Sequence, residues 1–362
     1  MRRKNILAGL GLLLLPGMLP ADDWTEKIRI KGDLRYRHET IQVEDRDARN
    51  RHRIRARLGI TAEPAGGITL GLQLASGSDD PVSTNQSLDG GFTSKDIRLD
   101  LAYVDLHTDA APGLHIIAGK MNNPFHAPGK TELVWDGDLN PEGGALQYRA
   151  SGDTVGLFAS AGGFAIDERS SDCDAWLFGG QAGLNFQASP DVRFTGGFSY
   201  YDYGNILGYT PVYDGDSFGN TLGEDGRFAH DYNLVEFFAE LGLKAGGVPV
   251  NLFFDYVQNV AQGLEGNNRA WLAGMTIGKT KDPGSWAARC NYREVEADAV
   301  FGTFTDSDFI GGGSDGKGSE CGVDVQIARA WTAGLSYFLN ERITTGDAPE
   351  YRRLQLDAAF KF

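Results

Sequence analysis

Two rows of arginine stand near the start of the chain, with most arginines spaced two apart. The rows consist of Arg29, Arg35, Arg37, Arg49, Arg51, Arg53, Arg55 and Arg57. Side chains two positions apart point to the same face of a β-strand, so each row would form a line of fixed positive charge. Such a line attracts anionic groups that pass along it. A second interpretation stays open, in which the arginines only solvate the wall of a wide aqueous space.

The segments that carry the arginines alternate between charged and apolar residues. In 49–63 the arginines fall on one face and Ile54, Ala56, Leu58 and Ile60 on the other, and the last twelve residues, 351–362, alternate in the same way. Alternating segments of about ten residues are typical of a transmembrane β-barrel, because one face of each strand meets lipid and the other meets water. A soluble β-sandwich also alternates, so the connections between the segments have to distinguish the two folds.

Short and long connections follow one another along the chain. Short breaks built on Gly, Pro or Asp lie at 64–67, 108–113, 151–153, 189–191, 245–247, 280–284 and 329–330. Longer polar insertions lie at about 40–48, 76–95, 122–142, 162–174, 204–230, 260–267, 297–318 and 343–350. Short turns at one end and long loops at the other are characteristic of outer-membrane barrels. The pattern predicts an all-β fold, a closed antiparallel transmembrane barrel of about sixteen strands with short periplasmic turns and long extracellular loops. Fourteen and eighteen are the neighbouring strand counts.

The N-terminus has the layout of a secretory signal peptide. Arg2, Arg3 and Lys4 precede an apolar run, 6–15, and Ala21 offers a small residue for cleavage. Residues 1–21 are therefore predicted to be a cleaved signal peptide, and 22–362 a single barrel domain. No later stretch reaches 18 consecutive apolar residues, so the sequence predicts no transmembrane helix.

Charge and composition exclude several classes of protein. The chain has 34 Lys and Arg against 49 Asp and Glu, a net charge of −15, which argues against a nucleic-acid partner. The six histidines show no zinc-binding spacing and no G-x-S-x-G sequence occurs, so we expect no catalytic residues, no metal, no cofactor and no enzymatic activity. Asp306, Asp308 and Asp315 lack the spacing of a helix-loop-helix calcium site, and a solvated loop is the expectation there.

The three cysteines allow one pairing hypothesis. Cys290 and Cys321 fall on the apolar faces of two segments joined by the insertion 297–318. A cross-strand disulfide is possible if the register brings their Cα atoms within about 7 Å, and two free thiols are the alternative. Cys173 is left over in either case.

Four segments and the terminal residue carry a family resemblance. They are RHRIRARLGI (51–60), GKMNNPF (119–125), ELVWDGDLNPEGGALQY (132–148), VEADAVFGTFTDSDFIGGGSDGKG (295–318) and Phe362. The chain resembles the putative porins of Gram-negative bacteria, which are similar to sixteen-stranded outer-membrane porins. The resemblance covers the whole mature chain.

The resemblance implies roles for particular residues. The segment 122–142 is expected to be an inward-folded constriction loop, whose acids, Glu132, Asp136, Asp138 and Glu142, would face the basic wall. Phe362 is expected to be the signal that the barrel-assembly machinery reads. A homotrimer in contact with outer-membrane lipid and lipopolysaccharide is also implied.

Three functions remain open at this level. The first is a water-filled channel for passive diffusion of small hydrophilic solutes and ions, with no cofactor. The second is an anion- or substrate-selective channel for phosphate or carboxylate solutes, in which the arginine rows bind the solute. The third is a structural or adhesive outer-membrane barrel whose acidic loops bind a partner.

Overall fold

We describe a computed structural model of the chain, which covers residues 27–343 and 349–362. The expected signal peptide, 1–21, lies outside the described residues. The strands are β1 Arg29–Val43, β2 Arg49–Ala65, β3 Ile68–Ser76, β4 Gln86–Ser87, β5 Ile97–His107, β6 Leu114–Lys120, β7 Glu142–Ala150, β8 Val155–Asp167, β9 Ala175–Ser189, β10 Val192–Gly204, β11 Tyr232–Ala245, β12 Val248–Asn259, β13 Arg269–Gly278, β14 Trp286–Val295, β15 Gly316–Ala328, β16 Trp331–Arg342 and β17 Tyr351–Lys361. Three short 3₁₀ turns are η2 Pro128–Lys130, η3 Gly302–Phe304 and η4 Phe309–Gly311.

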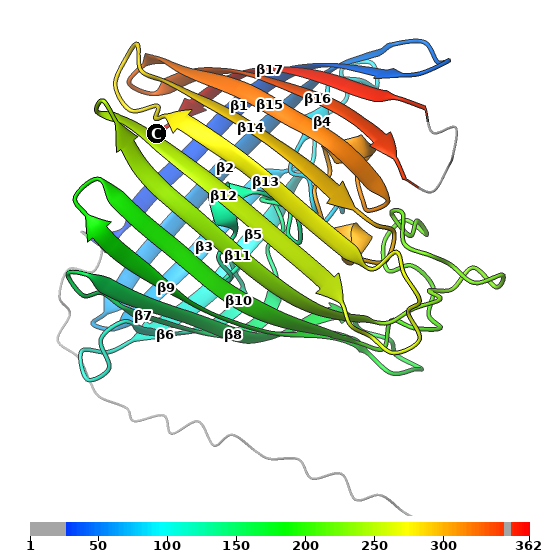
Figure 1. Cartoon of the computed structure of the whole chain (residues 1–362), viewed down its shortest axis with the longest axis horizontal. Coiled ribbons are helices and arrows are strands. Elements are labelled where there is room, and N and C mark those ends of the chain that lie inside the picture. Colours follow the sequence, from blue (N-terminus) through cyan, green and yellow to red (C-terminus); the bar gives the residue numbers. More distant parts are fainter. Residues whose placement is uncertain (1–26, 344–348) are drawn as a thin grey trace, which may run out of the picture.

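Sixteen of the described strands form one closed antiparallel barrel (Figure 1). Each long strand pairs with its neighbour in the chain, and β1 closes the ring by pairing with β17 from Asp33↔Lys361 to Val43↔Tyr351. The two-residue strand β4 lies in a loop and pairs with β2. Closure leaves no sheet edge with unpaired backbone groups in the lipid. The prediction of an all-β barrel with sixteen strands is confirmed.

The barrel has apolar side chains on its outside and charged ones within. On β1, Leu34 and Tyr36 are 50% and 44% exposed, whereas Arg37 and Glu39, on the other face of the strand, are 6% and 0% exposed. β17 shows the same alternation: Leu356 is exposed and Leu354 is partly exposed on the outer face, whereas Arg353 on the inner face is buried. An arginine facing lipid near the bilayer midplane costs about 2–4 kcal/mol, so the period of two fixes which face turns outward.

The short turns gather at one end of the barrel and the long loops at the other (Figure 1). Several strands extend further toward the long loops than the sequence pattern indicates. β1 continues to Val43, β8 continues to Asp167, and β15 begins at Gly316, inside segments that were expected to be loop. The alternating pattern stops where both faces of a hairpin meet water, while backbone pairing continues beyond that point.

Long loops fill part of the barrel interior. Met121, Phe125 and Trp135 of the loop 121–141 are buried in one cluster with Phe301 and Phe309 of the loop 296–315. The cluster packs against the inner faces of β10 and β11, through Tyr201, Tyr203, Tyr232 and Leu234. The lumen therefore has an apolar side packed with loop side chains.

The expectation of a solvated loop at Asp306, Asp308 and Asp315 is wrong. Phe301, Phe309 and their neighbours anchor this loop in the interior, and Asp306 is buried beside them. The aspartates indicated a polar loop correctly, but the charges of Asp306 and Asp308 are compensated by Arg293 and Arg353 inside the barrel rather than by water.

Among the described residues, no helix has the length and apolarity needed to cross a membrane.

Candidate functional site: the charged constriction

The arginines of β1 and β2 lie side by side on the inner wall. The register pairs Arg35 with Arg55 and Arg37 with Arg53, which places all four side chains on the same face. Because the intervening residues face lipid, these arginines point into the lumen. The geometry concentrates positive charge on one side of the interior.

Two of the eight arginines lie apart from this group. Arg29 is at the short-turn end, where its largely exposed guanidinium is 3.8 Å from Glu63. Arg49 is the first residue of β2 at the loop end and is exposed. The central part of the basic wall consists of Arg35, Arg37, Arg51, Arg53, Arg55 and Arg57.

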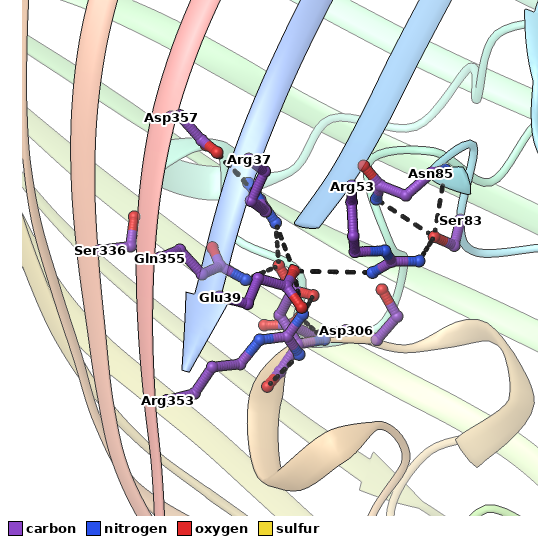
Figure 2. A network of polar contacts seen from close by, with 12 residues as sticks. Arg37, Glu39, Arg53, Ser83, Asn85, Asp306, Ser336, Arg353, Gln355 and Asp357 are labelled. Carbon is purple, nitrogen blue, oxygen red and sulfur yellow. Dashed lines mark hydrogen bonds and ion pairs between the residues drawn. The ribbon is translucent and has the colours of Figure 1, made fainter. Parts of the chain in front are cut away.

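Acids of the same strands compensate much of this charge. Glu39 lies among the arginines and is fully buried, with oxygens 2.5 Å from Arg51 and 3.6 Å from both Arg37 and Arg53. Figure 2 shows Arg37, Arg53 and the β17 residue Arg353 directed toward Glu39. The arginine rows are thus a mixed network of charges, and not the uncompensated line of positive charge that their spacing suggests.

Two further acids of the wall hold individual arginines. Asp33 accepts hydrogen bonds from Arg55 at 3.0 Å and Arg57 at 2.7 Å. Asp357 on β17 accepts two from Arg37, at 2.7 and 2.8 Å, a bidentate pair that fixes the guanidinium plane. The acids therefore orient the arginine side chains along the wall.

One acid of the loop 121–141 faces the basic wall. An oxygen of Asp138 lies 3.3 Å from Arg57 and 3.7 Å from Arg55, while the other accepts a hydrogen bond from the Thr84 hydroxyl at 3.0 Å. The loop therefore reaches across to β2 and to the loop that contains β4.

A second loop contributes Asp308, which the sequence did not single out as a site residue. Its carboxylate is 2.7 Å from Arg353 and 3.1 Å from Arg37, and it accepts a hydrogen bond from Gln355 at 2.8 Å. Burial alone would raise the pKa of Asp308, but the guanidinium groups of Arg353 and Arg37 outweigh it and lower the pKa below its usual value. Asp308 therefore stays ionised.

Glu132 and Asp136 meet a third acid instead of the β1–β2 wall. Their carboxylates and that of Asp306 have oxygens within 4.8 Å of one another, and Arg293 on β14 donates to Asp306 at 2.6 Å. Burial, reinforced by the neighbouring carboxylates, raises the pKa of Glu132 and of Asp136 well above the ordinary value. The remaining acid, Glu142, is the first residue of β7 and pairs with Lys120 at 2.8 Å in an exposed position.

The loops leave a polar cavity of about 360 Å³ beside the basic wall. Its charged lining comes from strands and from both inward-folded loops: Arg35, Arg37, Arg55, Arg57, Lys130, Glu132, Asp136, Asp138, Arg289, Arg293, Asp306, Asp308 and Glu320. Opposite charges facing one another across a narrow space create a transverse field, which orients dipolar solutes and disfavours apolar ones.

The sequence analysis did not single out the arginines on β14 and β17 as site residues. β14 carries Arg289 and Arg293 four positions apart, and β17 carries the adjacent Arg352 and Arg353, so neither strand has the repeated spacing of two that marks the first two strands. The position of Arg289, Arg293 and Arg353 on the inner face follows from strand parity, so a parity count on every strand could have found them.

The remaining sequence-derived residues lie outside the constriction. Phe362 exchanges backbone hydrogen bonds with Gly32 of β1 at 3.0 and 3.1 Å, and its side chain is 73% exposed. Cys290 and Cys321 are direct partners in the β14–β15 register, and a disulfide joins them. Cys173 is exposed and free.

Comparison with known proteins agrees with this architecture. The chain matches the family model described as "Putative porin" (Porin_5) over residues 40–214 and 228–362. No curated protein matches the chain by sequence.

Solved structures share the fold at low sequence identity. The chain is similar to Salmonella typhi OmpF in complex with daunomycin, with 13% identity, a TM-score of 0.59, and coverage of 92% of this chain and 97% of that one. It is similar to Pseudomonas putida OprB at high pH, with 12% identity, a TM-score of 0.61, and coverage of 94% and 96%. Vibrio cholerae OmpT gives 12% identity, a TM-score of 0.53, and coverage of 92% and 97%. With the family match covering most of its length, the chain belongs to the putative porin family and is a porin-type channel of the outer membrane.

Proposed function

We propose that this porin passes small hydrophilic solutes and ions by passive diffusion along the polar side of its lumen. The observation that carries the proposal is the cavity of about 360 Å³ inside the closed barrel, lined by charges of both signs. A solute that enters exchanges part of its hydration shell for contacts with these groups, whereas an apolar solute loses water without compensation. Transport of this kind needs no cofactor and no covalent step.

The path is expected to be narrow and displaced toward the basic wall. The loops 121–141 and 296–315 pack against the inner faces of β10 and β11, which leaves the charged side of the lumen for solutes. Asp138 on one side and Arg55 and Arg57 on the other supply the transverse field.

Conductance of single channels in a planar lipid bilayer tests the proposal. We expect an ohmic conductance that scales with salt concentration, and swelling of proteoliposomes in small neutral sugars. Absence of conductance from folded protein would contradict the proposal and favour the structural or adhesive barrel.

A substrate-selective channel for phosphate or carboxylate solutes is the second candidate. Six arginines from three strands line the cavity: Arg35, Arg37, Arg55, Arg57, Arg289 and Arg293. A guanidinium matches phosphate and carboxylate groups with two parallel hydrogen bonds, so a solute anion could replace one of the protein carboxylates. Block of the conductance by low concentrations of a polyanion, relieved by Arg289→Ala, would favour this candidate.

We further propose that the protein is exported through a cleaved signal peptide and assembles as a homotrimer in a Gram-negative outer membrane. The charged and apolar N-terminal segment supports export, and the similar OmpT of Vibrio cholerae has been solved in a form described as a trimer, at a TM-score of 0.54. Lipid, lipopolysaccharide and the barrel-assembly machinery are the remaining partners in this proposal. N-terminal sequencing of the mature protein and light scattering in detergent test cleavage and stoichiometry separately.

A further inference from the structure

A cluster of two histidines and an aspartate lies away from the constriction, at the short-turn end of the barrel. His107 ends β5 and His115 is the second residue of β6, and the two are direct partners across the antiparallel pair. Asp105 lies two residues before His107 on the same face of β5. The hairpin turn 108–113 connects the two strands.

These side chains lie on the inner face of the wall. His115 is opposite Gln147 of β7, whose amide donates a hydrogen bond to the carbonyl of Pro124 in the inward-folded loop. Tyr103, two residues before Asp105, packs against the buried cluster in the interior. The alternate residues Leu106 and Ile116 are the exposed, lipid-facing ones. The cluster therefore borders the short-turn mouth of the lumen.

The geometry of the three side chains suits a metal ion. The imidazole ring centroids of His107 and His115 are 5.5 Å apart, and Nδ1 of His115 is 2.9 Å from the Asp105 carboxylate. One ligand atom from each residue lies within 4.8 Å of the other two. Zn²⁺ binds imidazole nitrogen and carboxylate oxygen at about 2.0–2.2 Å, so small rotations of these side chains bring all three to bonding distance.

We propose that Asp105, His107 and His115 form a binding site for a divalent transition metal ion of the Zn²⁺ class, with a fourth coordination position open to the lumen. Imidazole and carboxylate ligands favour Zn²⁺, Ni²⁺, Co²⁺ or Cu²⁺ over Ca²⁺ and Mg²⁺, which prefer oxygen ligands only. Two ligands come from paired positions of adjacent strands and the third from the same face, so the barrel wall holds them in place before the metal arrives. The open position would take water or the carboxylate of a solute at the mouth.

A histidine pair elsewhere in the barrel gives a matched control. His38 and His52 are also direct partners, on β1 and β2, with ring centroids 4.7 Å apart. Their nearby polar groups are the Tyr36 hydroxyl and the Thr40 hydroxyl, and no carboxylate joins them in the described metal-ligand clusters. This pair tests whether two cross-strand imidazoles alone are sufficient.

Binding of Zn²⁺ to the purified, untagged, folded protein tests the site by isothermal titration calorimetry. We expect the unmodified protein to bind one Zn²⁺ per chain at this site. The double variant His107→Gln with His115→Gln should lose this Zn²⁺, and Asp105→Asn should bind it at least tenfold more weakly. The control His38→Gln with His52→Gln should retain that ion. The proposal would be overturned if the His107 and His115 double variant bound as many Zn²⁺ ions as the unmodified protein. It would also be overturned if Zn²⁺ binding were lost only in the His38 and His52 double variant.

Two further measurements distinguish a specific site from loss of fold. Co²⁺ bound to the unmodified protein should give the absorption bands of a four-coordinate ion, and these should be absent in His107→Gln. Each variant should show the same heat-dependent migration on electrophoresis as the unmodified barrel when metal is omitted, whereas saturating Zn²⁺ should raise the unfolding temperature only of proteins with the intact site. A rise of equal size in the His107 and His115 double variant would contradict the assignment.

Discussion

The guanidinium of Arg353 lies 2.8 Å from the carboxylate of Glu39, across the seam where the last strand of the barrel meets the first. The two residues are 314 positions apart, and both side chains are almost completely buried. Barrel closure therefore assembles the most buried ion pair of the basic wall, and the charge balance of the channel depends on the pairing of β1 with β17.

Replacing Glu39 tests this balance. In Glu39→Gln, Arg51, Arg353 and their neighbours lose their shared carboxylate, so we expect a shift of the reversal potential toward anions in a salt gradient. Breaking a buried ion pair by removing one partner costs about 3 kcal/mol, so the unfolding temperature should also fall. Glu63→Gln is the control, because Glu63 is only partly buried and its ion-pair partner Arg29, at 3.8 Å, is largely exposed at the barrel end. Equal effects of the two substitutions would argue against a special role for Glu39.

Opposite substitutions across the constriction should change ion preference in opposite directions. Asp138→Asn removes a negative charge that faces Arg55 and Arg57, and should move the reversal potential toward anions. Arg55→Ala with Arg57→Ala should move it toward cations. Arg29→Ala is the control for the loss of an arginine from the same wall, since Arg29 lies outside the constriction. If the double arginine variant keeps the reversal potential of the unmodified channel, the conducting path does not pass these residues.

The acids Glu132 and Asp136 predict a pH dependence of conduction. Burial and neighbouring carboxylates raise the pKa of both groups above the ordinary carboxyl value of about 4. On acidification, Glu132 and Asp136 therefore become protonated at a higher pH than ordinary carboxyl groups do. As the pH is lowered, the preference of the channel for cations should therefore begin to decline while the pH is still above about 4. Asp308, whose pKa is lowered by Arg353 and Arg37 despite its burial, keeps its charge over the same interval. Reversal potentials measured at stepwise lower pH check this.

The same raised pKa values have a consequence for stability. A carboxyl group with a higher pKa in the folded state than in the unfolded state favours folding when protonated, and this contribution is lost as the pH rises through the folded-state pKa. Glu132→Gln with Asp136→Asn should therefore make the barrel more resistant to unfolding at neutral pH and remove the early decline in cation preference. A double variant that still shows this decline would point to other groups, such as Asp306.

The bond between Cys290 and Cys321 predicts a specific peptide map. Digestion without reduction should give one cross-linked pair of peptides containing these residues, while Cys173 should react with an alkylating reagent before any reductant is added. Recovery of both Cys290 and Cys321 as free thiols would contradict the expectation. Because nine further residue pairs join β14 and β15, Cys290→Ser with Cys321→Ser should still form a barrel, with a lower unfolding temperature.

Deletion of Phe362 tests the proposed assembly role. Its backbone bonds with Gly32 close the barrel at the C-terminus, and its side chain is free for recognition by another protein. We expect the deletion to reduce the amount of folded barrel in the outer membrane, measured as the fraction with heat-dependent migration. Phe362→Tyr keeps the aromatic ring and the backbone bonds, so it should assemble at close to the normal level.

The amino-acid sequence by itself determined the number of barrel strands, which face of each strand turns outward, and the ends at which the turns and loops lie, although not how far each strand extends into the loops. Lipid imposes these features locally, because every second residue of a spanning strand has to be apolar, as at Leu34 and Tyr36. The same rule placed Arg35, Arg37, Arg53 and Arg55 on the inner wall before any tertiary contact was considered.

Only the tertiary structure decided which charges meet. Asp308 stands in no periodic pattern, and its contact with Arg353 and the basic wall depends on the path of the loop 296–315 and on barrel closure. The inward folding of that loop is driven by buried aromatic side chains such as Phe301, which packs against Tyr203 of the distant strand β10, and Phe309, which packs against Arg293 of β14. Contacts of this kind depend on long-range packing, which local alternation does not encode. The arginine rows and the acids on the same strand face, such as Asp33, could therefore be located from the sequence, whereas the contact of Asp308 with Arg37 and Arg353 could not.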